Sequence, residues 1–450
     1  MLESLKYWPP IVALTIIMTA CGSSNEKSNT PPAEDVEKID LHLSPDLSVN
    51  NSTSYEAQKS EFRHNRLFGF EENRYSGVYH GVGYGDFDDD GDIDFLQSGS
   101  NLVDKQRPYF YRQNNNGEFV REDSFITGGE GLIHPRKTIV GDFNGDDIPD
   151  VVNFGHGLDQ EPFAGEVAEL YLSTKSNLEF SNALSSYTGY FHSGAAGDID
   201  NDGDLDILMG DATNDGFYFL INNGNAQFTK SSDRITNADQ VQHRGYTTEL
   251  IDVNEDGYLD LLKGGHEIQG MDTAIYYGNS TGRYESPVIL PTIDKLGTVL
   301  DIEAEDINGD SLKDIIILRT GDNSGGKFTL YQGFYVQLLV ATGEKTFIDQ
   351  SNNIERRTDW AKRGGEDFRD RGVDAEYDDS NLSGEAPLGG WIDWIRVQDI
   401  NSDGLPDIID YQDARNITWI NNGDGSFSSN FKLEGEDYWA GKNDPYEIYE

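Results

Sequence analysis

The chain has 450 residues and carries 81 Asp and Glu against 34 Lys and Arg, which gives a formal net charge of −47 at pH 7. A surface of that charge repels nucleic acids, which excludes them as partners, and it attracts cations. Aromatic residues make up 11% of the chain, which is enough for a packed core and argues against an intrinsically disordered protein.

The first residues of the chain resemble a bacterial export signal. The apolar run IVALTIIMTA, residues 11–20, is too short to span a bilayer and ends in small residues. Cys21 follows directly, and the sequence MTAC resembles a lipobox, in which the cysteine receives the lipid. We therefore expect a lipoprotein signal peptide at 1–20 and a protein that is exported and anchored through Cys21 in a bacterial membrane, at the outer membrane or cell surface. An ordinary membrane anchor, or a cleaved signal with an incidental cysteine, is the alternative.

A polar, proline-containing stretch follows the signal. Residues 21–60 are therefore predicted to be a flexible tether. Cys21 is the only cysteine in the sequence, so no internal disulfide can stabilise the exported chain, and another kind of cross-link is expected to do so.

An acidic pattern of twelve residues then recurs six times. The first copy is DFDDDGDIDFLQ, and the steps between copies are 54 to 56 residues except the last, which is 93 and predicts an insertion at residues 351–390. The copies are numbered loops 1 to 6 after their lead aspartates, which are Asp86, Asp142, Asp198, Asp252, Asp306 and Asp399.

The segments around each loop have the pattern of strands. A short run rich in Ile, Leu and Val follows every loop, as in LDILMGD after loop 3, and indicates a strand. Between about 20 and 40 residues after each lead aspartate, an apolar run, an Asn/Gly turn and a second aromatic residue indicate a hairpin, as in FLINNGNAQF. Together with a strand before the loop, each repeat supplies four strands.

The chain is therefore predicted to be all-β, a β-propeller of four-stranded blades that spans residues 61–435 and is followed by a tail at 436–450. Six blades are counted, and a seventh, degenerate blade is allowed within 351–390 or 55–75. A linear β-solenoid is the alternative, but its turns are much shorter than the period of 54 residues.

Oxygen-bearing side chains stand at positions one, three, five and nine of every loop, and position seven offers a backbone carbonyl. Calcium binds six to eight hard oxygens at about 2.3 to 2.6 Å, and a tight loop with alternate residues facing inward supplies them. Without a cation, two carboxylates about 5 Å apart repel by roughly 3 kcal/mol at an effective dielectric near 20. We therefore expect about six calcium ions. The predicted ligand residues are Asp86, Asp88, Asp90, Asp92, Asp94, Asp142, Asn144, Asp146, Ile148, Asp150, Asp198, Asp200, Asp202, Asp204, Asp206, Asp252, Asn254, Asp256, Tyr258, Asp260, Asp306, Asn308, Asp310, Leu312, Asp314, Asp399, Asn401, Asp403, Leu405 and Asp407.

Two alternatives remain for the loops. Asp and Asn favour turns without any ion, and magnesium also binds carboxylates, although it retains its waters and prefers rigid octahedral sites. An EF-hand is excluded, because position twelve is never Glu and no helical pattern flanks the loops.

The six loops resemble the FG-GAP/VCBS-like repeat, the unit of the integrin α-chain N-terminal propeller and of many bacterial surface lipoproteins. The resemblance covers about residues 75–430, and it implies a propeller, often of seven blades, whose calcium loops join the first two strands of each blade. The literal Phe-Gly and Gly-Ala-Pro signature is absent. Position six is Gly in four loops and Asp147 or Ser311 in the other two, which are expected to be the weaker sites.

Six of the eight histidines lie near the opposite ends of these strands. Four precede a lead aspartate by 6 to 9 residues and two follow one by 14, which places them on the predicted face away from the acidic loops. They are interpreted either as strand-end residues that bond to the backbone, or as a recognition site for an anionic glycan or peptide or a transition metal. These residues are His80, His134, His156, His192, His243 and His266.

The sequence contains no nucleophile elbow, phosphate loop or zinc-protease helix motif, so no local motif indicates catalysis. The predicted function is a calcium-binding, lipid-anchored module for binding or adhesion, with a glycan or a protein as ligand. The alternative is a polysaccharide lyase or another carbohydrate-active propeller enzyme that uses the His/Arg face. A purely structural module of a larger surface assembly is the third hypothesis.

Overall fold

The computed structural model describes residues 78–100, 103–114, 119–213, 216–231, 233–235, 245–294, 296–322, 334–355, 394–399, 401, 403–410 and 418–429. All of these residues belong to the unit Leu47–Glu450. Several predictions concern parts of the chain outside the described residues. These are the signal peptide at 1–20, Cys21, the tether at 21–60, the tail at 436–450, His243, the side chain of His80 and residues 356–390 of the insertion.

Strands dominate the described residues, which contain short 3-10 helices but no α-helix. The all-β class is therefore confirmed for this part of the chain. No described helix has the length and apolar character that a bilayer crossing requires. The 3-10 helices are η3 (Asp123–Phe125), η4 (Asn182–Leu184), η6 (Glu267–Gln269) and η7 (Ser351–Asn353).

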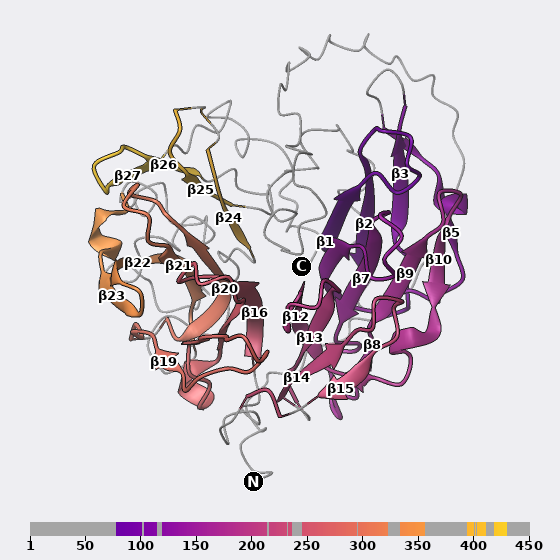
Figure 1. Cartoon of the computed structure of the whole chain (residues 1–450), viewed down its shortest axis with the longest axis horizontal. Coiled ribbons are helices and arrows are strands. Elements are labelled where there is room, and N and C mark those ends of the chain that lie inside the picture. Colours follow the sequence, from indigo (N-terminus) through magenta and orange to yellow (C-terminus); the bar gives the residue numbers. More distant parts are fainter. Residues whose placement is uncertain are drawn as a thin grey trace, which may run out of the picture. The chain divides into compact units, whose positions relative to one another are not determined.

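The described strands form six main sheets, numbered 1 to 6 along the chain, and Figure 1 colours them in sequence order. Sheet 1 contains β1 (Val78–Gly85), β2 (Asp94–Ser100), β3 (Tyr109–Gln113) and β4 (Phe119–Arg121). Sheet 2 contains β5 (Ile126–Thr127), β6 (Pro135–Gly141), β7 (Asp150–Gly155), β9 (Glu169–Ser173) and β10 (Leu178–Ser181). Sheet 3 contains β12 (Phe191–Gly197), β13 (Asp206–Asp211), β14 (Gly216–Ile221) and β15 (Thr229–Ser231).

The second half of the chain repeats the arrangement. Sheet 4 contains β16 (Gly245–Ile251), β17 (Asp260–Gly265), β18 (Ala274–Tyr276) and β19 (Val288–Ile289). Sheet 5 contains β20 (Thr298–Glu305), β21 (Asp314–Thr320), β22 (Tyr335–Gly343) and β23 (Thr346–Asp349). Sheet 6 contains β24 (Ile395–Gln398), β25 (Asp407–Asp410), β26 (Thr418–Asn421) and β27 (Phe427–Ser429). A separate small sheet pairs β8 (Glu166–Val167) with β11 (Thr188–Gly189).

The unit of strand, loop, strand and hairpin predicted for each repeat is confirmed. Five sheets have four strands in chain order, and sheet 2 adds β5 at its outer edge. In every sheet the acidic loop joins the first two strands, and its ninth residue pairs with the residue just before the lead aspartate, as Asp206 pairs with Gly197. All six loops therefore leave their sheets in the same register.

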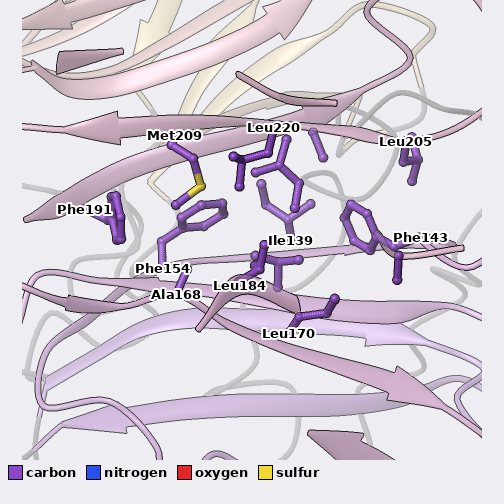
Figure 2. Close-up of a cluster of buried hydrophobic side chains, with 14 of the residues drawn as sticks. Ile139, Phe143, Phe154, Ala168, Leu170, Leu184, Phe191, Leu205, Met209 and Leu220 are labelled. Carbon is purple, nitrogen blue, oxygen red and sulfur yellow. The ribbon is translucent and has the colours of Figure 1, made fainter. Parts of the chain in front are cut away.

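Successive sheets pack on one another through apolar cores. Figure 2 shows the core between sheets 2 and 3, where Phe154 of β7 lies close to Met209 of β13. A Cβ at Gly194 would lie 2.4 Å from the Phe154 ring, so this glycine lets β12 approach β7. Corresponding buried clusters join sheets 1 and 2, 3 and 4, 4 and 5, and 5 and 6. Because strands such as β7 and β13 are packed on both faces, their residues are buried without alternation.

The sheets are also joined along both of their edges. The first strands contact one another in succession, β1 with β6, then β12, β16, β20 and β24. At the outer edge, the segment leaving one sheet pairs in parallel with the next, through Ile126 to sheet 2, Ile235 to sheet 4 and Ile354 to sheet 6. These pairings protect outer edge strands that would otherwise expose free backbone groups. Ile354, at the start of the predicted insertion, therefore belongs to a sheet edge.

Candidate metal centres

The lead aspartate closes each loop through hydrogen bonds to the backbone. In loop 3, the N–H groups of Asp202 and Gly203 donate to Asp198 Oδ1 and Oδ2 over 3.0 and 2.9 Å. The same two bonds recur in the other five loops. The carboxylate at position five accepts the N–H of position seven in all six, as Asp202 does from Asp204 over 3.1 Å. The six loops therefore share one hydrogen-bonding pattern.

The backbone is left-handed at position six of every loop and at position four of loops 1 to 5. Position six has a φ of 94° at Gly91, and φ is also positive at Asp147 (66°) and Ser311 (67°), where the sequence lacks glycine. In those two loops, glycine stands instead at position four, as Gly145 and Gly309. Every loop thus has one glycine among these two positions. Loops 2 and 5 were expected to be the weaker sites because they lack glycine at position six. In both, the glycine at position four adopts the left-handed backbone that a non-glycine residue adopts there in loops 1, 3 and 4.

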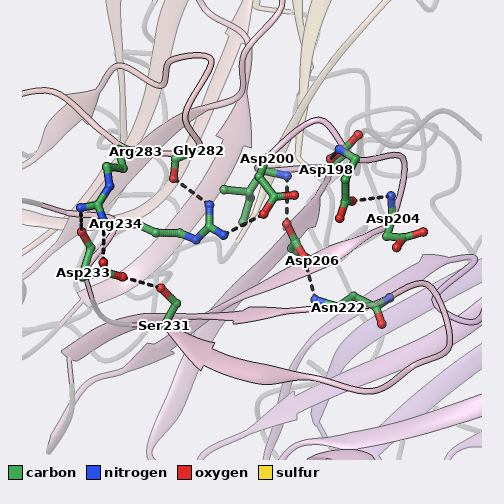
Figure 3. A network of polar contacts seen from close by, with 12 residues as sticks. Asp198, Asp200, Asp204, Asp206, Asn222, Ser231, Asp233, Arg234, Gly282 and Arg283 are labelled. Carbon is green, nitrogen blue, oxygen red and sulfur yellow. Dashed lines mark hydrogen bonds and ion pairs between the residues drawn. The ribbon is translucent and has the colours of Figure 1, made fainter.

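The ninth aspartate of every loop is fully buried, and in loops 2 to 5 it bridges two backbone segments. Asp206 Oδ2 accepts the N–H of Ile199 at the start of the loop over 3.1 Å, and Oδ1 accepts the N–H of Asn222 after β14 over 2.8 Å (Figure 3). A bond from Oδ1 of the ninth aspartate to a backbone N–H at or near the end of the third strand recurs in all six sheets. This aspartate therefore fastens its loop to the sheet, and the side chains concerned are Asp94, Asp150, Asp206, Asp260, Asp314 and Asp407, all 0% exposed.

Burial also makes the carboxyl groups at position nine of loops 1 to 5 weak acids in the metal-free protein, because it raises their pKa values. It raises the pKa of Asp206 to about 7, that of Asp150 to about 8 and that of Asp314 to about 6, and neighbouring aspartates of the same loops act in the same direction. Asp94 and Asp260 have pKa values of about 7 for the same reasons. A cation inside the loop would favour the ionised form of these groups near neutral pH.

The third position supplies the observation that fits a bound ion. Asp88 Oδ1, Asn144 Oδ1 and Asp200 Oδ1 are buried oxygens without a hydrogen-bond partner. Two clusters have one carboxylate oxygen per residue within 4.8 Å of the others: Asp86, Asp88 and Asp90 in loop 1, and Asp198, Asp200 and Asp206 in loop 3. Closely spaced, partly buried oxygens of this kind are the ligands that calcium and other hard cations prefer. Coordination by the carbonyl at position seven stays a prediction.

The far ends of the first strands, away from the acidic loops, carry a repeated β-bulge. In sheets 1 to 5 the register of the first strand slips around the residue that stands six positions before the lead aspartate. Bulges re-aim side chains and are frequent beside functional sites. The bulged residues are His80, Arg136, His192, Tyr246 and Leu300.

Four of the predicted histidines meet at this end of sheets 2 to 4. The ring centroids of His134 and His156 are 4.0 Å apart, and those of His156 and His192 are 5.0 Å apart. Tyr246 continues the row, 4.0 Å from His192 and 4.5 Å from His266. The convergence of these four histidines, expected from the sequence, is therefore observed.

The loop that follows β7 packs on this row of rings. Tyr190 stacks on His156 with a centroid distance of 4.3 Å, and its hydroxyl donates to Asp159 Oδ1 over 2.6 Å. Phe163 from the same loop meets the Tyr190 ring edge-on at 5.7 Å. Within the described residues, the groups of three or more His, Cys, Asp or Glu side chains whose ligand atoms lie within 4.8 Å of one another consist of aspartates alone.

Sequence reasoning missed Arg136, Tyr190 and Tyr246 at this end. Arg136 and Tyr246 share with His192 the spacing of six residues before the lead aspartate, which is the signal that identifies them. A search for histidines alone misses Arg136 and Tyr246, because the bulge recurs at the same backbone position in each repeat while the side chain at that position differs.

The acidic loops also lie in the segments that match a known protein family. The family model for the FG-GAP-like repeat matches residues 86–152 and 198–263, which contain loops 1 to 4. The chain is an FG-GAP repeat protein. Loops 5 and 6 lie beyond the matched residues, but they repeat the hydrogen bonds of the matched loops.

Solved structures similar to this FG-GAP repeat protein are distant. The biofilm matrix protein Bap1 of V. cholerae is 16% identical with a TM-score of 0.34, and the match covers 64% of this chain and 41% of Bap1. An exo-beta-1,3-galactanase from Clostridium thermocellum is 12% identical with a TM-score of 0.32, and the match covers 60% of this chain and 61% of the galactanase. The chain thus spans less than two thirds of either structure, and no curated protein matches it.

The histidine end of this FG-GAP repeat protein is expected to destabilise the fold in acid. Burial lowers the pKa of His192 well below its usual range, and Arg136 and the neighbouring imidazoles act in the same direction. Because the unfolded chain binds a proton near pH 6.5 and folded His192 does not, stability present above that pH is lost as the pH falls, by about 1.4 kcal/mol per pH unit. His192→Phe retains a ring and is expected to flatten this slope, measured as the urea midpoint from about pH 7 to 5 in saturating calcium. Parallel pH profiles of the variant and the natural protein would contradict the assignment.

Proposed function

We propose that the chain is a calcium-binding β-propeller, anchored by lipid at Cys21 outside the cytoplasm, that serves as a binding or adhesion module for a glycan or protein ligand. Each of the six acidic loops would hold one calcium ion. The observation that carries this proposal is the recurrence of one loop geometry, with a fully buried ninth aspartate in all six loops and an unpartnered third-position oxygen in loops 1 to 3.

The propeller arrangement is supported by the way in which successive sheets meet. Apolar cores link each sheet to the next, and the first strands contact one another in chain order. Radial packing of this kind lets each sheet bury both faces against its neighbours. The proposal counts six blades and leaves room for a seventh in the residues outside the described part.

Calcium would stabilise this fold in the way that disulfide bonds stabilise other exported proteins. Each ion would be held by oxygens at positions one, three, five, seven and nine, and the ninth aspartate already accepts a backbone N–H at or near the end of the third strand. Binding would therefore fasten the first, second and third strands of each blade together. A single-cysteine exported protein has no internal disulfide for that purpose.

The ligand would bind at the end of the sheets that carries the bulges. His134 is half-exposed there beside the buried row of rings. The alternative function, a carbohydrate-active enzyme such as a polysaccharide lyase, is favoured by the same cluster. Arg136 is a basic group of the kind that neutralises a uronate, and burial lowers the pKa of His192, whose neutral imidazole can accept a proton.

A glycan array probed with the full chain, with and without chelator, tests the proposal and its alternative. Calcium-dependent retention without cleavage supports a binding module, and shortened glycans support the enzyme. His134→Ala is expected to weaken retention about tenfold or more, whereas Val120→Ala, at an exposed position on β4, should leave it unchanged. Absence of both retention and cleavage, with the protein folded in calcium, would argue against glycans as its ligand.

A further inference from the structure

The six loops differ in charge at one ligand position. Position three is aspartate in loops 1 and 3, as Asp88 and Asp200, and asparagine in the other four. A further carboxylate about 5 Å from another repels it by roughly 3 kcal/mol at an effective dielectric near 20. Loops 1 and 3 would therefore be the least stable without an ion, unless the additional charge is compensated.

Loop 3 contains that compensation. Arg234 Nη2 lies 2.8 Å from Asp200 Oδ2, and their side chains are 14% and 25% exposed. The other guanidinium nitrogen, Nη1, donates to the carbonyl of Gly282 over 2.9 Å, so Arg234 spans from loop 3 to the hairpin turn of sheet 4 (Figure 3). The segment that carries Arg234 is held against the residues that follow this turn, because the Arg234 carbonyl accepts the N–H of Tyr284 and the adjacent Ile235 pairs with Tyr284.

Loop 1 contains the same compensation from a different place in the fold. Asp88 Oδ2 is ion-paired with Arg112, which lies on β3 of the same sheet and also pairs with Glu122. Arg112 and Arg234 occupy unrelated positions in their repeats, one within a hairpin strand and one in the segment that leaves the sheet. Two separate solutions therefore place a guanidinium on the same loop position, and they do so in the two loops that have aspartate there.

The arginines leave the second oxygen of each carboxylate free to bind. Asp200 Oδ1 and Asp88 Oδ1 are buried and have no hydrogen-bond partner, whereas Oδ2 of each residue contacts its arginine. The same two aspartates belong to the clusters whose oxygens lie within 4.8 Å of one another. A carboxylate divided in this way can face an ion with one oxygen and a guanidinium with the other, as the outer-shell partners of metal ligands commonly do.

We propose that Arg234 and Arg112 are positioning residues of loops 3 and 1, which orient the third-position carboxylate toward the ion and cancel its charge. With the charge at position three cancelled in loops 1 and 3, all six loops have the same set of charged ligand side chains, the carboxylates at positions one, five and nine. In loop 3, Arg234 also connects the ion site to sheet 4 through Gly282. This inference rests on the proposed binding of calcium by the loops.

A double-mutant cycle on the full chain tests the inference, with calcium-dependent hydrogen exchange of the peptide 197–208 as the readout for loop 3 and of 141–152 as the internal control for loop 2. Asp200→Asn leaves Arg234 uncompensated beside the ion and is expected to raise the calcium midpoint of loop 3 about tenfold or more. The double variant Asp200→Asn, Arg234→Gln recreates the neutral third position of the other loops and is expected to return to within about threefold of the natural midpoint. The loop 2 midpoint should stay constant throughout.

Equal midpoints for Asp200→Asn and the double variant, or a natural midpoint in Asp200→Asn, would overturn the inference. If a loop 3 variant does not fold, Asp88→Asn with and without Arg112→Gln supplies the same cycle on the peptide 84–96. The failure of calcium binding itself has a different signature, because loop 2 of the natural protein would then show no calcium-dependent protection.

Discussion

Asp206→Ala is expected to lower the free energy of unfolding by about 4 kcal/mol in calcium, because it leaves the buried N–H groups of Ile199 and Asn222 without an acceptor. Each unpaired buried donor costs roughly 1 to 3 kcal/mol, and the loss of a calcium ligand adds to that cost. The measurement is urea denaturation at saturating calcium, with hydrogen exchange of the peptide 197–208 as a local reporter.

Asp204→Asn, two residues earlier in the same loop, is the matched control. Position seven is expected to bind calcium through its backbone carbonyl, and the Asp204 N–H bond to Asp202 does not involve its side chain. This variant should change stability by less than about 0.5 kcal/mol and retain the calcium response of loop 3. Similar losses in the two variants would show that charge alone, and not the bonds of the ninth aspartate, accounts for the effect.

The repeat and its four-strand unit were predictable because they depend on local patterns. An acidic loop between two apolar runs, followed by an Asn/Gly hairpin, specifies strand order within a sheet, and sheets 1 and 3 to 6 follow it. The same period predicts which aspartates share a loop. It does not predict what the segments between sheets do, since the pairing of Ile126, Ile235 and Ile354 with the next sheet joins residues that no short-range pattern relates.

The candidate sites were predictable in part for the same reason. The ligand positions follow from spacing. The second role of the ninth aspartate, as acceptor of a backbone N–H at or near the end of the third strand, depends on a contact between distant positions such as Asp206 and Asn222. Glycine stands at position six in four loops and at position four in loops 2 and 5. These placements are recognised as equivalent only once both positions are known to have positive φ. Arg112 and Arg234 lie at unrelated repeat positions, so only the folded chain shows that they face the same loop residue.

Removal of calcium is expected to have the largest effect of all. Extracellular calcium modules have dissociation constants of roughly 0.1 to 1 mM, so an excess of ten- to a hundredfold stabilises the folded state by about 1.4 to 2.7 kcal/mol per site. Six sites acting on one cooperative unit would contribute about 8 to 16 kcal/mol, comparable to the whole stability of a typical domain. For a protein of this size that corresponds to a rise in Tm of about 10 to 20 °C.

Calorimetry across a calcium titration, from chelator to millimolar calcium, tests the central claim most directly. The account predicts a Tm that rises by at least about 10 °C and continues to rise with calcium concentration, with a much smaller shift for magnesium at equal concentration. A Tm that is the same in chelator and in calcium would contradict the account, because loops that bind no ion in the folded state cannot stabilise the fold through calcium.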